Sequence, residues 1–232
     1  MILRGNAIDL IESLDENPDL IVTDPPYAAG NTEAEHRMTA AVAIVLRESA
    51  RRLAKGRWML VMCAASYRSQ AFMVESVRGL VEPVRVATWC KPKARSKVQT
   101  TGWAWASVSV IAFRKGKSEV PFASGHLDHI LAEPVINGRR AELPSEVAEW
   151  MVAPFAVPGG LCLDPFAGTG KILKAAEVFN MRTLGYELNP QSPKTSDDTE
   201  RNESLADTGE CQHHCPRWMV CALCLANVRA VA

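Results

Sequence analysis

The sequence predicts an α/β fold of the Rossmann-like kind, with a mostly parallel, twisted sheet and helices on both faces. Short apolar runs rich in β-forming residues alternate with segments of helical period, which is the pattern of strands joined by crossover helices. The composition is that of a globular protein, since 47% of the 232 residues are hydrophobic and 22% are charged. The formal net charge is zero, so the charge of the whole chain indicates neither a nucleic-acid nor a membrane partner.

Six apolar runs are expected to be strands, and they cover residues 20–24, 58–63, 84–89, 108–113, 161–164 and 183–187. Between the first two runs, apolar side chains from Met38 to Leu53 recur at helical spacing. Thr32 and Glu35 can form a capping box at the start of this helix, and Gly56 can end it.

Two more helices are expected in the second half of the chain. Pro144 suits the first turn of a helix that continues from Ser145 to Trp150, because a proline there gives up no helical hydrogen bond. The other helix is expected from Lys171 to Asn180, directly after a glycine-rich turn.

The chain is expected to divide into a domain over residues 1–190, a disordered linker over 191–210 and a Cys-rich tail over 211–232. The linker carries six acidic residues against Lys194 and Arg201, and so polar a stretch buries too little apolar surface to fold. No apolar run approaches the roughly 18 residues that a membrane span needs, and the first residues do not begin a signal peptide. A cytoplasmic protein without a membrane partner is therefore expected.

The seven cysteines fall into two groups. Cys63, Cys90 and Cys162 lie in apolar stretches and are expected to be small buried hydrophobes rather than parts of a disulfide framework. In the tail, two close pairs of thiolates could close a tetrahedral zinc site: Cys211 with Cys215, and Cys221 with Cys224. Adventitious thiols in a frayed terminus are the competing interpretation.

Charge is concentrated between Arg85 and Lys117, where eight basic residues and no acidic residue give a local charge of +8. An anionic partner is expected to bind here. Trp103 and Trp105 follow the basic cluster, and they suit either a loop that stacks on bases or one buried face of a strand. His126 and His129 lie among polar residues and are expected at the surface.

The first motif with chemical content is Thr23-Asp24-Pro25-Pro26-Tyr27, at the end of an apolar strand, where open α/β sheets bind ligands. The two prolines fix φ near about −65° and remove both N–H groups, so backbone carbonyls here accept hydrogen bonds without internal competition. A carboxylate beside a rigid carbonyl suits a planar NH2 donor, and Tyr27 offers a flat face for a base. An ordinary strand-ending turn is the alternative.

The second motif runs from Asp164 to Gly170 and leads from a strand into a helix. Its glycines, Gly168 and Gly170, allow a ligand to approach the backbone closely. Glu187 ends the next strand with an acid, which is the usual device for holding two ribose hydroxyls. A phosphate-binding P-loop is excluded because Ile172 stands where that motif requires Ser or Thr. Together these features indicate a site for an adenosyl ligand.

The two motifs in this order resemble the amino-methyltransferases of DNA in their permuted, beta-class order, which methylate exocyclic amines of adenine or cytosine. The resemblance covers Leu3 to Pro190 and implies the Rossmann-like methyltransferase fold, with S-adenosylmethionine as the cofactor. It implies catalytic roles for Asp24, Pro25, Pro26 and Tyr27. The cofactor-binding residues that it implies are Asn6, Asp24, Asp164, Phe166, Gly168, Gly170 and Glu187.

Double-stranded DNA is the expected partner, a homodimer is left open, and a small recognition segment is expected at about residues 91–140. Lys91, Lys93, Arg95 and Lys97 are the expected nucleic-acid-binding residues. The family usually has Asp where Asn6 stands, so contact with the cofactor's adenine is expected to be weaker or differently made. It also usually has a His-Glu pair near Ser107, which this chain lacks.

Asp24 in the first motif position favours adenine N6 as the methylated atom, because many cytosine-modifying relatives carry Ser there. The alternatives are a DNA cytosine-N4 methyltransferase, an RNA adenine methyltransferase, and a cofactor-binding module without transfer activity.

Overall fold

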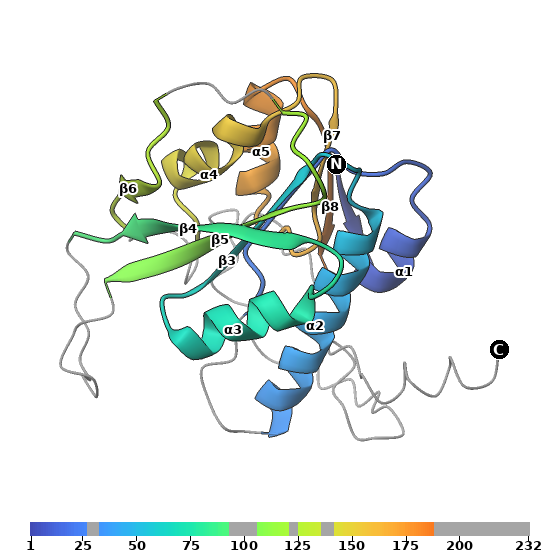
Figure 1. Ribbon diagram of the computed structural model, residues 1–232, viewed down its shortest axis with the longest axis horizontal. Helices are drawn as coiled ribbons and strands as arrows, with labels where there is room; N and C mark the ends of the chain where they lie inside the picture. Colours follow the sequence, from blue (N-terminus) through green and yellow to red (C-terminus); the bar gives the residue numbers. More distant parts are fainter. Residues whose placement is uncertain (27–32, 93–105, 121–124, 136–141, 188–232) are drawn as a thin grey trace, which may run out of the picture.

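An eight-stranded sheet forms the centre of the structure, with the strands in the order β1-β8-β7-β2-β3-β5-β4-β6 (Figure 1). The computed structural model describes residues 1–26, 33–92, 106–120, 125–135 and 142–187. The strands are β1 (Ile2–Arg4), β2 (Leu20–Thr23), β3 (Trp58–Ala64), β4 (Glu82–Cys90), β5 (Ser107–Arg114), β6 (His129–Leu131), β7 (Leu161–Asp164) and β8 (Arg182–Glu187).

The sheet is mostly parallel. β1, β8, β7, β2 and β3 pair in parallel, and β6 pairs in parallel with β4. β5 runs antiparallel to both β3 and β4, so it is the one reversed strand among those described. β4 therefore points the same way as β3, and its C-terminal end lies at the same edge of the sheet as the ends of β2 and β7.

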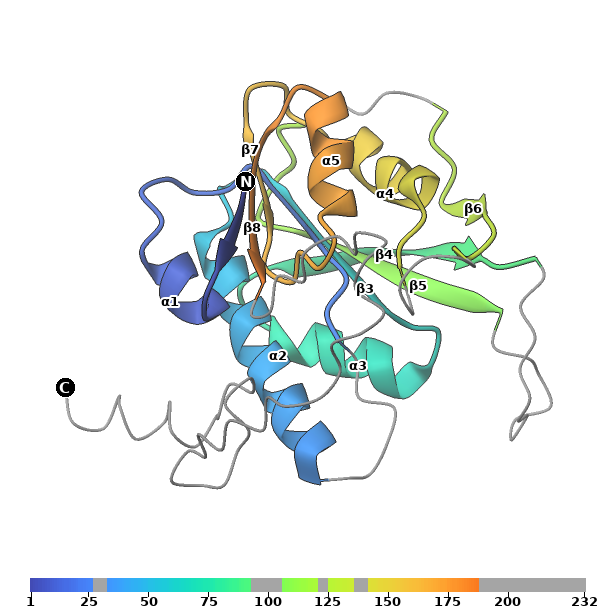
Figure 2. The same cartoon turned by 180° about the vertical axis from the view of Figure 1, so that it is seen from behind.

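Helices cover both faces of the sheet, as the sequence predicts. Figure 1 shows α4 (Ser145–Val152) and α5 (Lys171–Val178) on one face, and α1 (Ala7–Glu12), α2 (Glu33–Arg52) and α3 (Tyr67–Ser76) on the other. Figure 2 shows the same two layers from behind. A short 3-10 turn, η1 (Ala153–Phe155), follows α4.

Two hydrophobic cores, one on each face, follow from the alternation of side chains along the buried strands. In β2, Leu20 and Val22 join the core under α4 and α5, whereas Ile21 joins the core under α1, α2 and α3. β3 alternates in the same way. Cys63 and Cys162 are fully buried free thiols and Cys90 is half-buried, which agrees with their expected role as small hydrophobes.

All six predicted strands and all three predicted helices are present, with ends shifted by a few residues. Pro144 is the N-cap of α4 rather than part of its first turn, and α5 ends at Val178, two residues before Asn180. Four elements were not predicted from the sequence: the strands β1 and β6 and the helices α1 and α3. Two of these are strands of three residues, too short to show a period of two.

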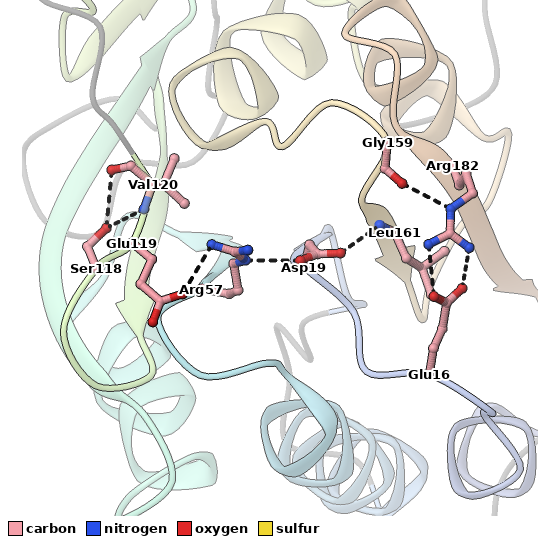
Figure 3. Close-up of polar contacts among 9 residues, drawn as sticks. All are labelled: Glu16, Asp19, Arg57, Ser118, Glu119, Val120, Gly159, Leu161 and Arg182. Carbon is pink, nitrogen blue, oxygen red and sulfur yellow. Dashed lines mark hydrogen bonds and ion pairs between the residues drawn. The ribbon is translucent and has the colours of Figure 1, made fainter.

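A polar network joins the segments that precede four strands, at the edge of the sheet opposite to the strand ends named above (Figure 3). The carboxylate of Asp19, just before β2, accepts hydrogen bonds at 3.0 Å from Arg57 Nε and from the backbone N–H of Leu161. Arg182, at the start of β8, donates to Glu16 at 2.8 Å and to the carbonyl of Gly159 at 3.0 Å. These bonds fix the starts of β2, β3, β7 and β8 relative to one another.

None of the helices in the described ranges is long and apolar enough to cross a membrane. The predicted linker over residues 191–210 and the predicted tail over 211–232 lie outside the described residues.

We predict that Asp19→Ala lowers the free energy of unfolding by about 2 kcal/mol, because the part-buried N–H of Leu161 loses its acceptor and Arg57 keeps only its longer ion pair with Glu119, at 3.8 Å. Denaturant unfolding measures this loss. Glu75→Ala is the matched control, because it removes an exposed ion pair between the last turn of α3 and Arg78, which follows the helix, and should cost less than about 0.5 kcal/mol. Equal losses in the two variants would contradict the role given to Asp19.

Candidate active site

The candidate site lies where the chain direction across the sheet reverses, between β2 and β7. From β7 the chain crosses through α5 to β8 on one side, and from β2 it crosses through α2 to β3 on the other. In open α/β sheets the C-terminal ends of the two strands at such a point flank the ligand crevice. Asp24 follows β2 directly and Asp164 ends β7, so both predicted motifs meet here.

A buried hydrogen bond joins the two motifs. The hydroxyl of Thr23 donates to Asp164 Oδ1 over 2.7 Å, although the two residues are 141 positions apart in the sequence. The backbone N–H of Phe166 donates to the same oxygen over 3.1 Å. Burial raises the pKa of Asp164 to about 7, and the hydrogen bonds from Thr23 and Phe166 act in the opposite direction.

Asp24 carries an acceptor that the fold does not satisfy. Its Oδ1 atom is buried and has no hydrogen-bond partner among the described residues. Burial raises the pKa of Asp24 to about 6, and the charge of Lys91 opposes that rise. Pro25 is buried next to it and Pro26 is exposed. A buried polar atom without a partner calls for an explanation, and a ligand that donates a hydrogen bond supplies one.

The glycine-rich turn after β7 has the backbone conformation that only glycine adopts readily. Gly168 has φ +50° and Gly170 has φ +75°, both in the left-handed region. A Cβ added at Gly168 would have the carbonyl oxygen of Phe166 as its nearest described atom, at 4.0 Å, apart from the two chain neighbours, so the described residues leave open space beside Gly168. Gly170 is the N-cap of α5.

Glu187 ends β8 beside this turn, at the same edge of the sheet. One of its carboxylate oxygens accepts a hydrogen bond of 2.9 Å from the N–H of Gly168. Arg4, at the end of β1, is the register partner of Glu187, so Asn6 lies near the same strand ends. The carboxylates of Asp24, Asp164 and Glu187 therefore follow the ends of neighbouring strands along one edge.

The side chain of Asn6 has a structural role that was not predicted from the sequence. Its Oδ1 accepts a hydrogen bond of 3.1 Å from the N–H of Ile8 and so caps α1. The sequence signal was available, because an asparagine followed by a helix-forming segment with Asp9 in its first turn is a common helix start.

Lys91 follows β4 at this edge, in surroundings that differ from those expected for an exposed DNA contact. Its ammonium nitrogen lies 4.5 Å from the ring centre of Trp89. The side chain is half-buried and interacts electrostatically with Asp24. The other predicted residues of this group, Lys93, Arg95 and Lys97, lie outside the described residues, as do Tyr27, Trp103 and Trp105.

Three described cations of the basic stretch from Arg85 to Lys117 make polar contacts within the fold. Arg114 pairs with Glu82 at 2.8 Å, and Arg85 pairs with Asp128 at 3.0 Å. Lys115 donates hydrogen bonds to three carbonyls at the C-terminal end of α2. Because β4 and β5 are antiparallel, these residues lie far along the sheet from Lys91.

A separate hollow of about 260 Å³ lies between the sheet and α4, and its lining is mostly apolar. Trp58, Trp150 and Phe155 are among its lining residues, and none of the motif residues lines it. The candidate site therefore lies at the strand ends, and this hollow is separate from it.

Two remaining expectations concern histidines and zinc. His129 is exposed over 53% of its side chain, as expected for a surface residue. The predicted zinc ligands Cys211, Cys215, Cys221 and Cys224 lie outside the described residues. Within the described ranges there is no group of three or more His, Cys, Asp or Glu side chains that could hold a metal ion.

Comparison with known proteins relates the chain to DNA methylases. The profile of a family described as DNA methylase matches residues 93–197, which include the glycine-rich turn and Glu187. A Type II methyltransferase from Methanocaldococcus jannaschii, M.MjaI, is 38% identical over 56 residues. That match spans 24% of this chain and 18% of the relative's length.

Solved structures share the fold over most of this chain. A protein from Thermus thermophilus described as a DNA modification methylase is 25% identical, with a TM-score of 0.62 over 82% of this chain and 89% of its own. The M1.HpyAVI complex with SAM is 19% identical, with a TM-score of 0.65 over 82% and 92%. The PvuII DNA methyltransferase, which is cytosine-N4-specific, is 18% identical, with a TM-score of 0.66 over 82% of both chains.

These findings confirm the predicted fold class and the resemblance to the amino-methyltransferases of DNA.

We predict that Asp24→Asn raises the free energy of unfolding by about 1 to 3 kcal/mol at pH 8. The folded-state pKa of Asp24, about 6, lies above the ordinary aspartate value. The native state therefore becomes less stable as the pH rises from about 4 through 6, because it must then hold a buried charge. A neutral amide of the same shape avoids that cost, so the gain should shrink steadily toward pH 4.

Urea denaturation at pH 8 and pH 5 measures this effect. Asp9→Asn, at an exposed position of α1, is the control and should give no such gain at pH 8. An Asp24→Asn variant that is no more stable than the wild type at pH 8 would show that this carboxylate does not destabilise the fold.

Proposed function

We propose that this protein transfers a methyl group from S-adenosylmethionine to an exocyclic amine of a base in double-stranded DNA, with adenine N6 as the preferred target. The observation that carries the proposal is the buried Oδ1 of Asp24, which has no hydrogen-bond partner in the described part of the chain and lies at the strand end next to the glycine-rich turn of a DNA-methylase-like fold. The relatives named above support the methyl-transfer chemistry and the polymer.

The target base must leave the duplex, because pairing and stacking otherwise shield its amine. The amine nitrogen is a poor nucleophile, since its lone pair is delocalised into the ring. Hydrogen bonds from its two N–H groups to the Asp24 carboxylate and the Pro25 carbonyl favour a pyramidal nitrogen. That geometry frees the lone pair for in-line attack on the methyl group, and Asp24 acts through position and charge. Tyr27 is proposed to stack on the flipped base, and Pro26 keeps the turn rigid.

The residues along the strand ends fit the cofactor, which supplies the activated methyl group when bound. Open space beside Gly168 leaves room for a ligand against the backbone. Glu187 is proposed to hold the ribose hydroxyls, and Phe166 to pack against the adenosyl part. Asp164 is proposed to support the site indirectly. Its hydrogen bonds with the Thr23 hydroxyl and with the N–H of Phe166 hold the two motifs together.

We propose that DNA is held through its phosphates by Lys93, Arg95 and Lys97. The segment available for sequence recognition, about residues 91–140, is short. Phosphate contacts set affinity without encoding sequence, so a segment of this size favours a short recognition site.

The choice of adenine rests on Asp24, where many cytosine-modifying relatives carry Ser. The test is to incubate the protein with S-adenosylmethionine and duplex DNA, digest the DNA to nucleosides and identify the modified one by mass spectrometry. N6-methyladenine is the expected product. N4-methylcytosine would overturn the base preference, and methylation of RNA but not of DNA would overturn the polymer. Cofactor binding without any methylation would indicate a non-catalytic module.

We predict that Asp24→Ala abolishes methyl transfer, by at least about 100-fold in kcat, because the amine loses its charged acceptor. Cofactor affinity should stay within a few-fold of the wild-type value, since the carboxylate is assigned to the base. Single-turnover kinetics and calorimetric titration measure the two quantities. Near-normal turnover in a folded Asp24→Ala variant would end this mechanism.

We predict that Gly168→Val loses at least about tenfold in cofactor affinity, because a β-branched side chain would fill the open space and strain a left-handed backbone. Gly116→Val is the matched control. Gly116 has φ +76° and equally open surroundings, but it follows β5 at the opposite edge of the sheet. Both variants should lose stability, and only Gly168→Val should lose affinity for S-adenosylmethionine in calorimetry. Unchanged affinity would show that the cofactor lies elsewhere.

A further inference from the structure

We propose that Thr23 is a positioning residue for methyl transfer, whose buried hydroxyl fixes the place of Asp24 relative to the glycine-rich turn after β7. The inference rests on the proposed function and deepens it. Thr23 is given no contact with the base or the cofactor, and it acts through its hydrogen bond to Asp164.

The backbone pairing between β2 and β7 stops before either motif begins. The last pair of residues that the two strands form is Ile21 with Leu163. Proline explains why the pairing goes no further, because Pro25 and Pro165 have no N–H group to donate. Beyond this pair, backbone hydrogen bonds between the two strands do not set the separation of their ends.

The hydroxyl of Thr23 supplies the connection that the backbone lacks. It donates to Asp164 Oδ1 over 2.7 Å, and the N–H of Phe166 donates to the same oxygen over 3.1 Å. Thr23 is 0% exposed and Asp164 is 1% exposed, so the bond is shielded from water. Within the described chain, no other hydrogen bond joins residues 23–26 to residues 164–170.

On its other side, the glycine-rich turn is held by β8. The N–H of Ala167 donates to the carbonyl of Tyr186 over 2.9 Å, and the N–H of Gly168 donates to Glu187 Oε2 over 2.9 Å. These bonds do not depend on β2. The turn therefore keeps its place against β8 when the threonine hydroxyl is removed, and the amine acceptor after β2 is what shifts.

This arrangement separates effects on binding from effects on chemistry. Each half of the site keeps its own contacts, so cofactor and DNA should each bind with little change when the hydroxyl is lost. In-line attack requires the amine nitrogen and the methyl carbon at one distance and angle, and a displacement of about 1 Å can cost about 100-fold in rate. Because Asp24 directly follows Thr23, a shift of the threonine moves the acceptor with it.

A bond that only stabilises the fold is the competing role for the Thr23 hydroxyl. The rest of β2 is apolar and buried, and valine would keep the branched shape of threonine there without burying a hydroxyl. A purely structural bond would change the stability of a Thr23→Val variant and leave the rate of methyl transfer per folded molecule unchanged.

The test compares Thr23→Val with Thr23→Ser in single-turnover methyl transfer to duplex DNA. Valine removes the donor, so the rate constant should fall at least about tenfold. The Kd for S-adenosylmethionine, measured by calorimetry, should stay within about threefold of the wild-type value, because the turn keeps its bonds to β8. Serine keeps the hydroxyl and should restore most of the rate.

Thr183→Val is the matched control. The hydroxyl of Thr183 also donates to a carboxylate, Glu177 Oε1, over 2.8 Å, but Thr183 lies near the start of β8, at the opposite edge of the sheet. This variant should keep the wild-type rate constant.

A second measurement does not require activity. It is a double-mutant cycle of Thr23→Val and Asp164→Ala in urea denaturation. Removing either partner breaks the same bond, so the two losses of stability should not be additive.

A folded Thr23→Val variant that transfers methyl groups at the wild-type rate would overturn the inference. So would a fall of the same size in Thr23→Ser or in Thr183→Val, or a loss confined to cofactor affinity. If the wild-type protein methylates neither DNA nor RNA, the proposed function fails and the cycle still tests the link. Additive losses in the cycle would overturn the inference whatever the activity.

Discussion

The contact between the end of β2 and the end of β7 is the constraint on which the candidate site depends. Each strand alone carries half of the candidate site: Asp24, with its buried acceptor, follows β2, and the glycine-rich turn follows β7. The bond from the Thr23 hydroxyl to Asp164 joins them across 141 residues of sequence. Because Asp164 also accepts the N–H of Phe166, one buried carboxylate sets the position of both loops. Any change that separates these strands would displace both motifs of the candidate site together.

The sequence was sufficient to predict the fold class, the six longer strands and both motifs, because each depends on local periodicity or on glycine and proline chemistry. It could not predict the reversal of β5, since an apolar run has no direction until its neighbours are known. The same limit applies to the described part of the basic stretch. Because β4 and β5 are antiparallel, Lys91 lies at one edge of the sheet and Lys115 at the other, although both belong to one basic stretch of sequence.

Two predicted site residues, Asn6 and Lys91, have neighbours that the sequence did not reveal. Resemblance assigned Asn6 to the cofactor, and the structure shows that its side chain also caps α1. Lys91 was assigned to DNA because it belongs to a basic stretch, and its ammonium group lies over the ring of Trp89. Both contacts are ones that only the folded chain provides.

The two edges of the sheet use charge in opposite ways, and this difference separates stability from activity. At the edge where strands begin, Asp19 and Glu16 are each paired with an arginine and contribute hydrogen bonds to the fold. At the edge where strands end, Asp164 is buried, Asp24 is partly buried, and burial raises the pKa of both. The Oδ1 atom of Asp24 is buried and has no hydrogen-bond partner among the described residues. A buried acceptor without a hydrogen-bond partner costs stability, so the stability of the described fold does not explain Asp24. An unsatisfied acceptor of this kind is typical of a ligand-binding site, while the paired edge keeps the strands in register.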